Sequence, residues 1–215
     1  MINFFKRILL TATLLFLLPR PQGTLLPITG TNSTDSTSST ANVQTLADFT
    51  TDLKNGNARQ AVGIYADEEF ALPIVQQPNA NPSFVSREEE KVTYFAMTAS
   101  YGSIGLVAHN DLAGKHFFDL QEGDTLTLVY GDGHQKKYEI SHIYALQALS
   151  PTSPYSRFID PESPEKVMSV EEVFTQMYGE KGSLVLQTCI AKEGVDSWGR
   201  LFIIAEPALT PSQVK

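Results

Sequence analysis

Short apolar runs rich in β-branched and aromatic residues, each bounded by turn residues, dominate the middle and the end of this chain. TLTLVY, residues 125–130, is followed by a Gly-Asp-Gly turn and by KKYEISHIYAL, residues 136–146, which is the pattern of a β-hairpin. IGLVAH at 104–109, SLVLQT at 183–188 and LFIIA at 201–205 predict three further strands. Many short strands with few helices favour a mainly β fold, either a barrel or a sandwich.

Two segments carry the signals of a helix start. SVEEVFTQMYG, residues 169–179, has Ser169 as an N-cap and Glu172 at the capping-box position, and it ends at a glycine. SREEEKVTYF, residues 86–95, repeats the spacing of serine and glutamate, although its second half is rich in β-formers. We therefore expect one or two short helices beside the strands.

The composition limits what the chain can bind. Its 215 residues suffice for one domain with appendages, and its apolar fraction of 42% is that of an ordinary soluble domain. The net charge of −8 argues against a nucleic-acid partner, because such a protein needs a basic face to neutralise phosphates. The same charge disfavours a purely electrostatic attachment to anionic lipid.

The first residues have the pattern of a targeting segment. Lys6 and Arg7 precede an apolar run at residues 8–19. This order predicts a signal peptide or an uncleaved N-terminal membrane anchor at residues 1–20. A buried core helix fits the terminal position and the charged flank of the run less well.

A linker is expected between this segment and the globular part. Residues 31–45 are mostly serine and threonine and cannot bury enough apolar surface to order themselves, so we predict a flexible linker at residues 21–57. The globular domain is expected at residues 58–207, and residues 208–215 are expected to form a loose tail.

Cys189 is the single cysteine of the chain and the first candidate for chemistry. An unpaired cysteine is commonly a small buried hydrophobic residue, and this interpretation stays open on the residue alone. The alternative is a nucleophile, because a cleft can open where the predicted strand SLVLQT meets a loop. A free cysteine, with a pKa near about 8.5, then needs a nearby cation or base at neutral pH.

Four histidines are candidates for that partner. His109 closes the predicted strand IGLVAH and precedes Asn-Asp, a turn signal, so its position mirrors that of the cysteine. His134 is expected at the tip of the hairpin, and His142 in the core or on a face of a strand. His116 is undecided.

Acyl transfer also needs a group that stabilises the negative oxygen of a tetrahedral intermediate. Arg200 opens the predicted strand LFIIA and is either a solvated strand end or such a group. The loop at residues 190–199 can bring the two strands side by side, which would place Arg200 and Cys189 at the same end of a sheet. A metal site is not expected, because the chain has no Cys-x-x-Cys or His-Glu-x-x-His pattern.

Three motifs occur in the order of a known enzyme family. AHN with His109, LVLQTC with Cys189 and WGRLFIIA with Arg200 resemble the histidine, cysteine and arginine motifs of the sortases. FFDLQEGDTLTL, residues 117–128, resembles the family's sequence after its histidine. The similarity covers roughly residues 60–207.

The sequence departs from the family pattern at two positions. Ala108 stands where a glycine commonly precedes the histidine, and Val185 replaces the first threonine of the cysteine motif. Neither change removes a reacting group. The resemblance implies a closed eight-stranded sortase-type β-barrel, with residues 151–182 in the place of the substrate-recognition loop.

The resemblance also implies a reaction, cysteine transpeptidation. The thiolate of Cys189 would attack the threonine carbonyl of a sorting signal and form a thioacyl enzyme. His109 would protonate the leaving amine and later deprotonate the incoming one, while Arg200 would stabilise the oxyanion or position the peptide. The residues assigned to substrate binding are Thr188, Ala108 and Trp198.

The partners implied are sorting-signal peptides of exported proteins and an amine acceptor, with a membrane contact through the N-terminal segment and no nucleic acid. No cofactor is expected, and calcium activation is left open. The protein would be exported to the bacterial cell surface, membrane-anchored or secreted. Two alternatives stay open: a hydrolytic cysteine peptidase that resolves the same intermediate with water, and a catalytically silent sortase-fold module that binds peptides.

Leu26–Gly30 reads Leu-Pro-Ile-Thr-Gly, which has the form of the signal that sortases cut. Chance accounts for such a word in a linker. The competing hypothesis is contact in cis, in which this word acts as a pseudo-substrate and a cut between Thr29 and Gly30 frees the domain. The chain from Gly30 to the domain could reach about 90 Å when extended, so the word can approach the site.

Overall fold

Eight β-strands close into a barrel in the computed structural model, which describes residues 44–79, 81–153 and 155–208. The strands are β1 (Ala61–Ala66), β2 (Phe70–Gln76), β3 (Val92–Phe95), β4 (Ile104–Val107), β5 (Thr125–Tyr130), β6 (Gln135–Ala148), β9 (Leu184–Lys192) and β10 (Val195–Pro207). They follow one another in the order β10-β9-β4-β3-β2-β1-β5-β6, and β6 pairs again with β10 to complete the ring. The predicted mainly β fold with a closed eight-stranded barrel is confirmed.

Two of the neighbouring strand pairs in the barrel are parallel, and the others are antiparallel. The hairpins β1–β2, β5–β6 and β9–β10 are antiparallel, whereas β2–β3 and β4–β9 are parallel pairs. The predicted hairpin around the Gly-Asp-Gly turn is β5–β6. The parallel pair β4–β9 matters most for function, because it brings the segment after β4 beside the middle of β9.

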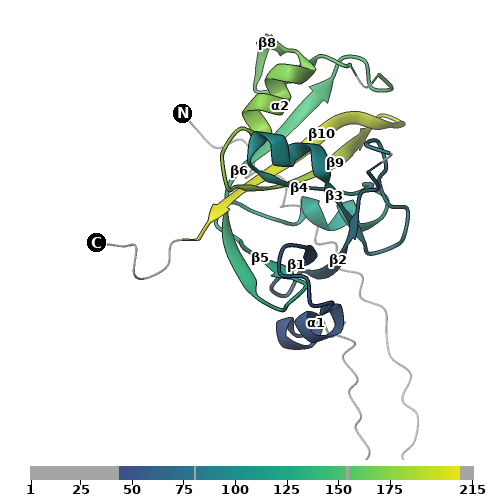
Figure 1. Cartoon of the computed structure of the whole chain (residues 1–215). Coiled ribbons are helices and arrows are strands. Elements are labelled where there is room, and N and C mark those ends of the chain that lie inside the picture. Colours follow the sequence, from purple (N-terminus) through teal and green to yellow (C-terminus); the bar gives the residue numbers. More distant parts are fainter. Residues whose placement is uncertain (1–43, 80, 154, 209–215) are drawn as a thin grey trace, which may run out of the picture. The chain divides into compact units, whose positions relative to one another are not determined.

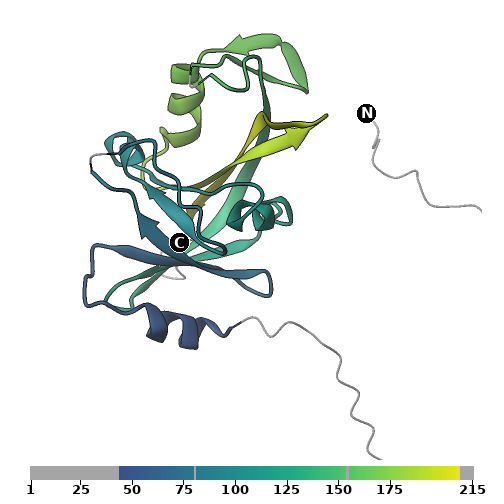
Figure 2. The same cartoon turned by 90° about the vertical axis from the view of Figure 1, so that its right-hand side faces the viewer.

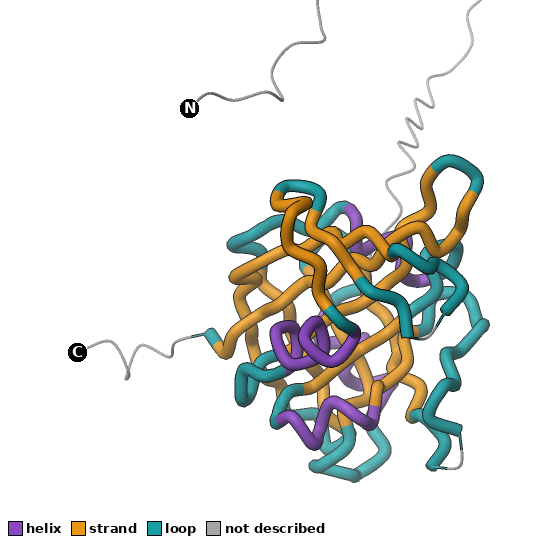
Figure 3. The backbone as a smooth tube through the Cα atoms, turned by 90° about the horizontal axis from the view of Figure 1, so that it is seen from above, coloured by secondary structure: helices purple, strands orange, loops and turns teal. Residues whose placement is uncertain are grey.

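Alternate residues of each strand fill the barrel. Leu184 and Leu186 of β9 and Leu201 and Ile203 of β10 belong to the interior cluster, whereas Val185 belongs to a cluster on the outer surface. Burying a side chain of this size stabilises the fold by about 1.5–3 kcal/mol relative to exposing it. The same alternation decides which side chains β9 and β10 present outside the barrel. Figure 3 traces the backbone of the strands in orange.

A second layer covers the outer face of β6, β9 and β10. Residues 151–182, the predicted insertion, contain β7 (Phe158–Asp160), β8 (Ser163–Met168) and α2 (Val170–Tyr178). Met177 and Tyr178 of α2 are fully buried and cluster with Val185 and Phe202. Figure 1 shows α2 and β8 beside the long strands β6 and β10. The insertion therefore forms a wall next to the strands that carry the cysteine and arginine motifs.

Helix α2 begins as predicted. The Ser169 hydroxyl accepts from the Glu172 amide at 3.2 Å, and the Glu172 carboxylate accepts from the Ser169 amide at 2.7 Å. This reciprocal pair is a capping box, and it satisfies two amides at the start of the helix.

The second predicted helix, at residues 86–95, is wrong. Its last four residues, Val92–Phe95, form β3, in keeping with their β-branched and aromatic side chains. The Ser86 hydroxyl accepts from the amide of Glu88, two residues on, so it closes a turn instead of capping a helix. Glu90 has a φ of 53°, which a right-handed helix does not include.

Helix α1 (Leu46–Leu53) lies inside the stretch that the sequence assigns to the linker, residues 21–57. Thr45 caps it, and Phe49 is only 2% exposed because it packs with Val62 and Tyr65 of β1. Figure 2 shows α1 beside this part of the sheet. The folded region therefore begins earlier than residue 58, and the missed signal was the helical spacing of Leu46, Phe49 and Leu53.

No helix within residues 44–79, 81–153 and 155–208 is both long and apolar enough to cross a membrane. The predicted signal peptide or anchor at residues 1–20 and the word at Leu26–Gly30 lie outside the described residues.

Candidate active site

Cys189 and Arg200 face each other across the β9–β10 hairpin. They are direct partners in the antiparallel register, so their side chains stand on the same face of the sheet and their Cβ atoms are neighbours. That face is the outer one, because Thr188 and Leu201, the next pair along the ladder, are buried and Leu201 belongs to the interior cluster. Both side chains are partly exposed. The two residues were predicted to lie together at the same end of a sheet, and they do lie side by side.

The two residues were expected at the ends of their strands, but they do not lie there. Strand pairing continues past them to Val195 and Lys192, and the hairpin turns only at Glu193 and Gly194. Both turn residues have positive φ, 54° and 77°, as a type I′ turn requires. Cys189 and Arg200 therefore lie within the hairpin, close to a register shift between Val195 and Gly199, rather than at the edge of a loop.

The Arg200 guanidinium is held by its own strand. Nη1 donates to the carbonyl oxygens of Ser197 at 3.1 Å and Gly199 at 2.8 Å. None of the salt bridges among the described residues involves Arg200. A guanidinium carries five N–H donors, so donors remain on Nε and Nη2 for an anionic or carbonyl oxygen.

His109 reaches the same region from β4. The parallel β4–β9 pair aligns Val107 with Gln187, and the Ala108 amide donates to the Gln187 carbonyl at 3.2 Å. His109 follows directly and is partly exposed. His109 and Cys189 line one pocket of about 210 Å³, which we call the thiol pocket. The remaining residues that line it are Gln77, Pro82, Ser83, Val85, Phe95, Val107, Ala108, Gln187 and Thr188.

Backbone hydrogen bonds fix the loop that carries His109. The His109 carbonyl accepts from the amides of Leu112 and Gly114, at 3.1 and 2.9 Å. Gly114 belongs to the 3-10 helix η2 (Ala113–Phe118), and a Cβ at this position would lie 2.3 Å from the Thr188 hydroxyl. The Asn110 side chain also donates to the carbonyl of Asp196, at 3.3 Å, and so joins the loop to the β9–β10 hairpin.

Thr188 and Ala108, the two residues expected to contact substrate, line the thiol pocket and are also bonded to each other. The Thr188 hydroxyl donates to the Ala108 carbonyl at 2.9 Å, and the two residues are 2% and 6% exposed. The Thr188 side chain therefore joins β9 to the backbone that follows β4. Trp198 does not line the thiol pocket. The Lys192 Nζ lies over the Trp198 ring, 4.6 Å from its centroid.

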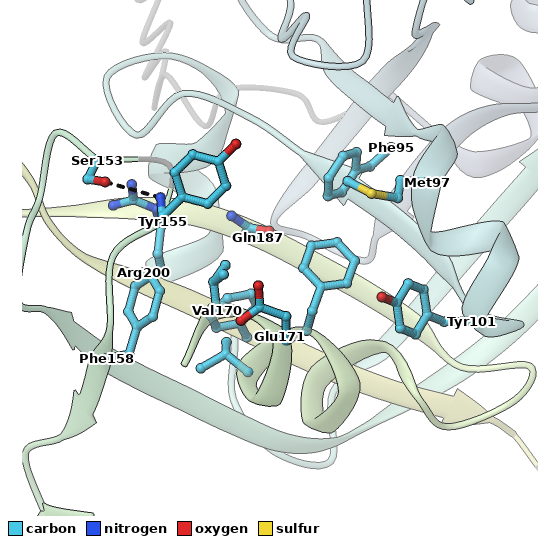
Figure 4. A pocket seen from close by; sticks show the side chains of 13 residues that line it. Phe95, Met97, Tyr101, Ser153, Tyr155, Phe158, Val170, Glu171, Gln187 and Arg200 are labelled. Carbon is cyan, nitrogen blue, oxygen red and sulfur yellow. Dashed lines mark hydrogen bonds between the residues drawn. The ribbon is translucent and has the colours of Figure 1, made fainter. Parts of the chain in front are cut away.

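A larger groove of about 430 Å³ adjoins the thiol pocket, and we call it the aromatic groove. Its lining residues are Phe95, Met97, Tyr101, Ser153, Tyr155, Phe158, Val170, Glu171, Val173, Phe174, Gln187, Arg200 and Phe202. Figure 4 shows Phe95, Met97 and Tyr101 at one end and Ser153, Arg200 and Phe158 at the other, with Gln187 and Glu171 between them. Phe95 and Gln187 line both cavities, so the two cavities are neighbours.

The other histidines lie away from the thiol pocket. His134 bonds to Asp132 at the hairpin tip, at 2.6 Å, as expected for a turn residue. His116 bonds to Glu90, also at 2.6 Å, and His142 is exposed on β6. Among the described residues, no group of three or more His, Cys, Asp or Glu side chains could hold a metal ion.

Solved structures similar to this chain include several sortases. Sortase A from Corynebacterium diphtheriae is 17% identical, with a TM-score of 0.45 over 71% of this chain and 63% of that chain. Sortase C1 from Streptococcus suis is 14% identical, with a TM-score of 0.47 over 79% and 82%. Sortase A from Listeria monocytogenes is 11% identical, with a TM-score of 0.44 over 74% and 94%. These three proteins carry the name of the family that the sequence motifs resemble.

The chain thus spans less than two thirds of the Corynebacterium protein. No protein-family model matches the sequence, and no curated protein matches it.

Gln187 and Phe95 line both cavities, but neither was predicted as a site residue from the sequence. A signal for Gln187 was present in LVLQTC, because strand alternation places it on the same face as Cys189, two residues on. Phe95 gave no such signal, because the sequence does not reveal that β3 lies beside β4 in the barrel.

Proposed function

We propose that this protein is a sortase-like cysteine transpeptidase. It cleaves a sorting-signal peptide of an exported protein through a thioacyl intermediate on Cys189 and transfers the acyl group to an amine. The observation that carries the proposal is the register of β9 and β10, which pairs Cys189 with Arg200 on one face while His109 lines the pocket of the thiol.

The proposed reaction begins with a Cys189 thiolate and a His109 imidazolium. Sγ attacks the scissile carbonyl carbon, and the carbonyl electron pair moves to oxygen. Free N–H groups of Arg200 donate to this oxyanion. When the C–N bond breaks, the leaving amine takes a proton from His109, and a thioester remains on the enzyme.

The second half reverses these steps with a different amine. The incoming amine attacks the thioester carbonyl and gives a proton to His109. The tetrahedral intermediate then expels the Cys189 thiolate, which restores the starting enzyme and completes a new amide. The reaction needs no cofactor, and water in place of the amine would make the protein a hydrolytic peptidase.

The aromatic groove supports a peptide substrate with an apolar side chain. Phe95, Met97, Tyr101 and Phe174 supply a largely apolar surface next to the thiol pocket. Burying an apolar side chain there would contribute about 1.5–3 kcal/mol to binding. Ala108 and Thr188 would contribute by fixing the backbone beside the thiol.

The N-terminal predictions remain part of the proposal. Residues 1–20 would export the protein to the bacterial cell surface and, when uncleaved, anchor it in the membrane. The Leu-Pro-Ile-Thr-Gly word at Leu26–Gly30 would then contact the site in cis. Sequencing the N-terminus of the expressed full chain tests this contact: a start at Gly30 that disappears in Cys189→Ala supports it, and identical full-length protein from both retires it.

Peptide turnover tests the catalytic proposal. The full chain is incubated with peptides that contain Leu-Pro-x-Thr-Gly and its variants, with and without triglycine, and products are identified by mass spectrometry. We expect a triglycine adduct and a thioester-linked enzyme, both absent in Cys189→Ala and His109→Ala. His134→Ala serves as the matched histidine control because it lies at the hairpin tip.

Three results would distinguish the alternatives. Cleavage without an adduct, at all triglycine concentrations, would identify a hydrolytic peptidase. Binding of peptide without any cleavage would identify the silent module. Turnover that survives Cys189→Ala would contradict the mechanism itself.

A further inference from the structure

Gln187 occupies the boundary between the two cavities of the site. It lines both the thiol pocket and the aromatic groove, and it precedes Cys189 by two residues on the same face of β9. Two residues of a strand span about 6.6–6.8 Å. A peptide that runs from the groove to the thiol along β9 therefore passes over Gln187.

The side chain of Gln187 is held at its oxygen. The Tyr178 hydroxyl donates to Oε1 of Gln187 at 2.5 Å. Tyr178 is 0% exposed, and burial raises the pKa of its hydroxyl, so the group stays a protonated donor at neutral pH. The Tyr178 ring packs against Phe95, Phe174 and Phe202, which fixes the direction of the donor.

This contact decides which end of the amide is free. Among the described residues, Gln187 is the one hydrogen-bond partner of the Tyr178 hydroxyl, so a flipped amide would leave the buried hydroxyl proton without an acceptor. Leaving a buried donor unpaired costs about 1–3 kcal/mol, which disfavours the flip. The two N–H donors on Nε2 therefore remain for a ligand, and Figure 4 shows the nitrogen on the side of the groove toward Tyr155.

We propose that Gln187 binds the substrate through a hydrogen bond from Nε2 to a main-chain carbonyl of the peptide, one or two residues from the scissile bond, and that Tyr178 is the residue that positions this amide. The inference rests on the proposed peptide chemistry and names a specificity element within it. A main-chain carbonyl fits best, because an extended peptide offers one at every residue whatever its side chains. A peptide that covers the amide without supplying an acceptor would leave a desolvated donor behind.

Two matched changes test the contact, one on each partner. Gln187→Met keeps the length of the side chain and removes the donor, and it should lower kcat/KM roughly three- to tenfold. Gln135→Met is the control, because that glutamine donates to Thr50 of α1 and lies outside both cavities. Peptides in which successive amides near the scissile bond are replaced by a trans-alkene remove the acceptor without adding charge.

The expected pattern is a thermodynamic cycle. With the native enzyme, one alkene peptide should have a kcat/KM that is lower than that of the all-amide peptide by a similar factor. With that same peptide, Gln187→Met should lower kcat/KM no further. Tyr178→Phe frees the amide to rotate, so it should lower kcat/KM by a smaller factor, mainly through KM, and add nothing to Gln187→Met. The rate at which iodoacetamide alkylates Cys189 should be unchanged in Gln187→Met, since the thiol itself is untouched.

The outcomes separate this inference from the proposed function. Equal kcat/KM for the native enzyme and Gln187→Met overturns the inference and leaves the transpeptidase intact. The inference is also overturned if Gln187→Met lowers kcat/KM by the same factor with every alkene peptide as with the all-amide peptide. If the native enzyme turns over no peptide while Cys189 reacts normally with iodoacetamide, the proposed function fails and the inference fails with it.

Discussion

Replacing Gly114 with alanine perturbs the loop that carries His109 at a crowded point. The added Cβ would lie 2.3 Å from the Thr188 hydroxyl and 2.7 Å from the His109 carbonyl oxygen, where ordinary contacts are 3.4–4 Å. Thr188 is already committed to the Ala108 carbonyl, so the loop must move by about 1 Å. Overpacking of this kind costs about 1–3 kcal/mol of the free energy of unfolding. A displacement of about 1 Å between His109 and Cys189 should lower kcat/KM by about a hundredfold.

The assay compares stability and turnover in the same preparation. Urea denaturation gives the free energy of unfolding, and peptide transfer gives kcat/KM. Gly63→Ala is the matched control, because its Cβ would lie 2.5 Å from Leu53 and 2.7 Å from Phe49, two side chains of α1. We expect both variants to be destabilised and only Gly114→Ala to lose activity. Native kcat/KM in Gly114→Ala, or equal losses in both variants, would refute the reasoning.

Three further predictions concern other parts of the molecule. Arg200→Gln should lower kcat/KM roughly a hundredfold. Arg200→Lys should recover kcat/KM only in part, because a guanidinium offers a planar fork of donors. Steady-state kinetics of the two variants tests this. Ser169→Ala removes the N-cap of α2 and should cost about 1 kcal/mol in the free energy of unfolding, and an unchanged urea midpoint would contradict that role. Burial by itself raises the pKa of Glu90, but hydrogen bonds from Lys115 and His116 outweigh it and hold the pKa below the ordinary value of 4.5. The contribution of Glu90 to the free energy of unfolding is therefore present above about pH 4.5 and is lost as the pH falls through its lowered pKa. The urea midpoints of the native protein and of Glu90→Gln should therefore converge in acid.

The strands β4, β5, β6, β9 and β10 were readable from the sequence because their signals are local. LVLQTC alternates Leu184 and Leu186 toward the barrel and Gln187 and Cys189 away from it, a period of two that any half-buried strand imposes. The capping box at Ser169 is also local, since its two hydrogen bonds join residues three apart. Such features need no knowledge of what packs against them.

Features with a weak local signal, or that depend on distant partners, were not readable. Glu193 and Gly194 form a tight turn with positive φ, but Glu-Gly is a weaker turn signal than Asn-Gly, so the hairpin was predicted to end earlier than it does. Helix α1 was assigned to a linker because its short apolar stripe gains its stability from β1, which lies elsewhere in the fold. The joining of the two cavities at Gln187 follows from the β4–β9 pair and the placement of α2, and neither is encoded locally.

The three candidate catalytic residues are held in different ways, and this difference predicts where the site is sensitive. Cys189 and Arg200 are fixed by a long hairpin ladder, which opens only when much of the barrel opens. His109 depends on a few contacts, namely the amides that bond to its carbonyl, the Thr188 hydroxyl and the Asn110 amide. Each such bond contributes about 0.5–1.5 kcal/mol, so the loop can shift at a cost far below global unfolding. Substitutions around the loop should therefore lower turnover by more than the accompanying loss of stability explains, whereas substitutions that open the hairpin should lower both together.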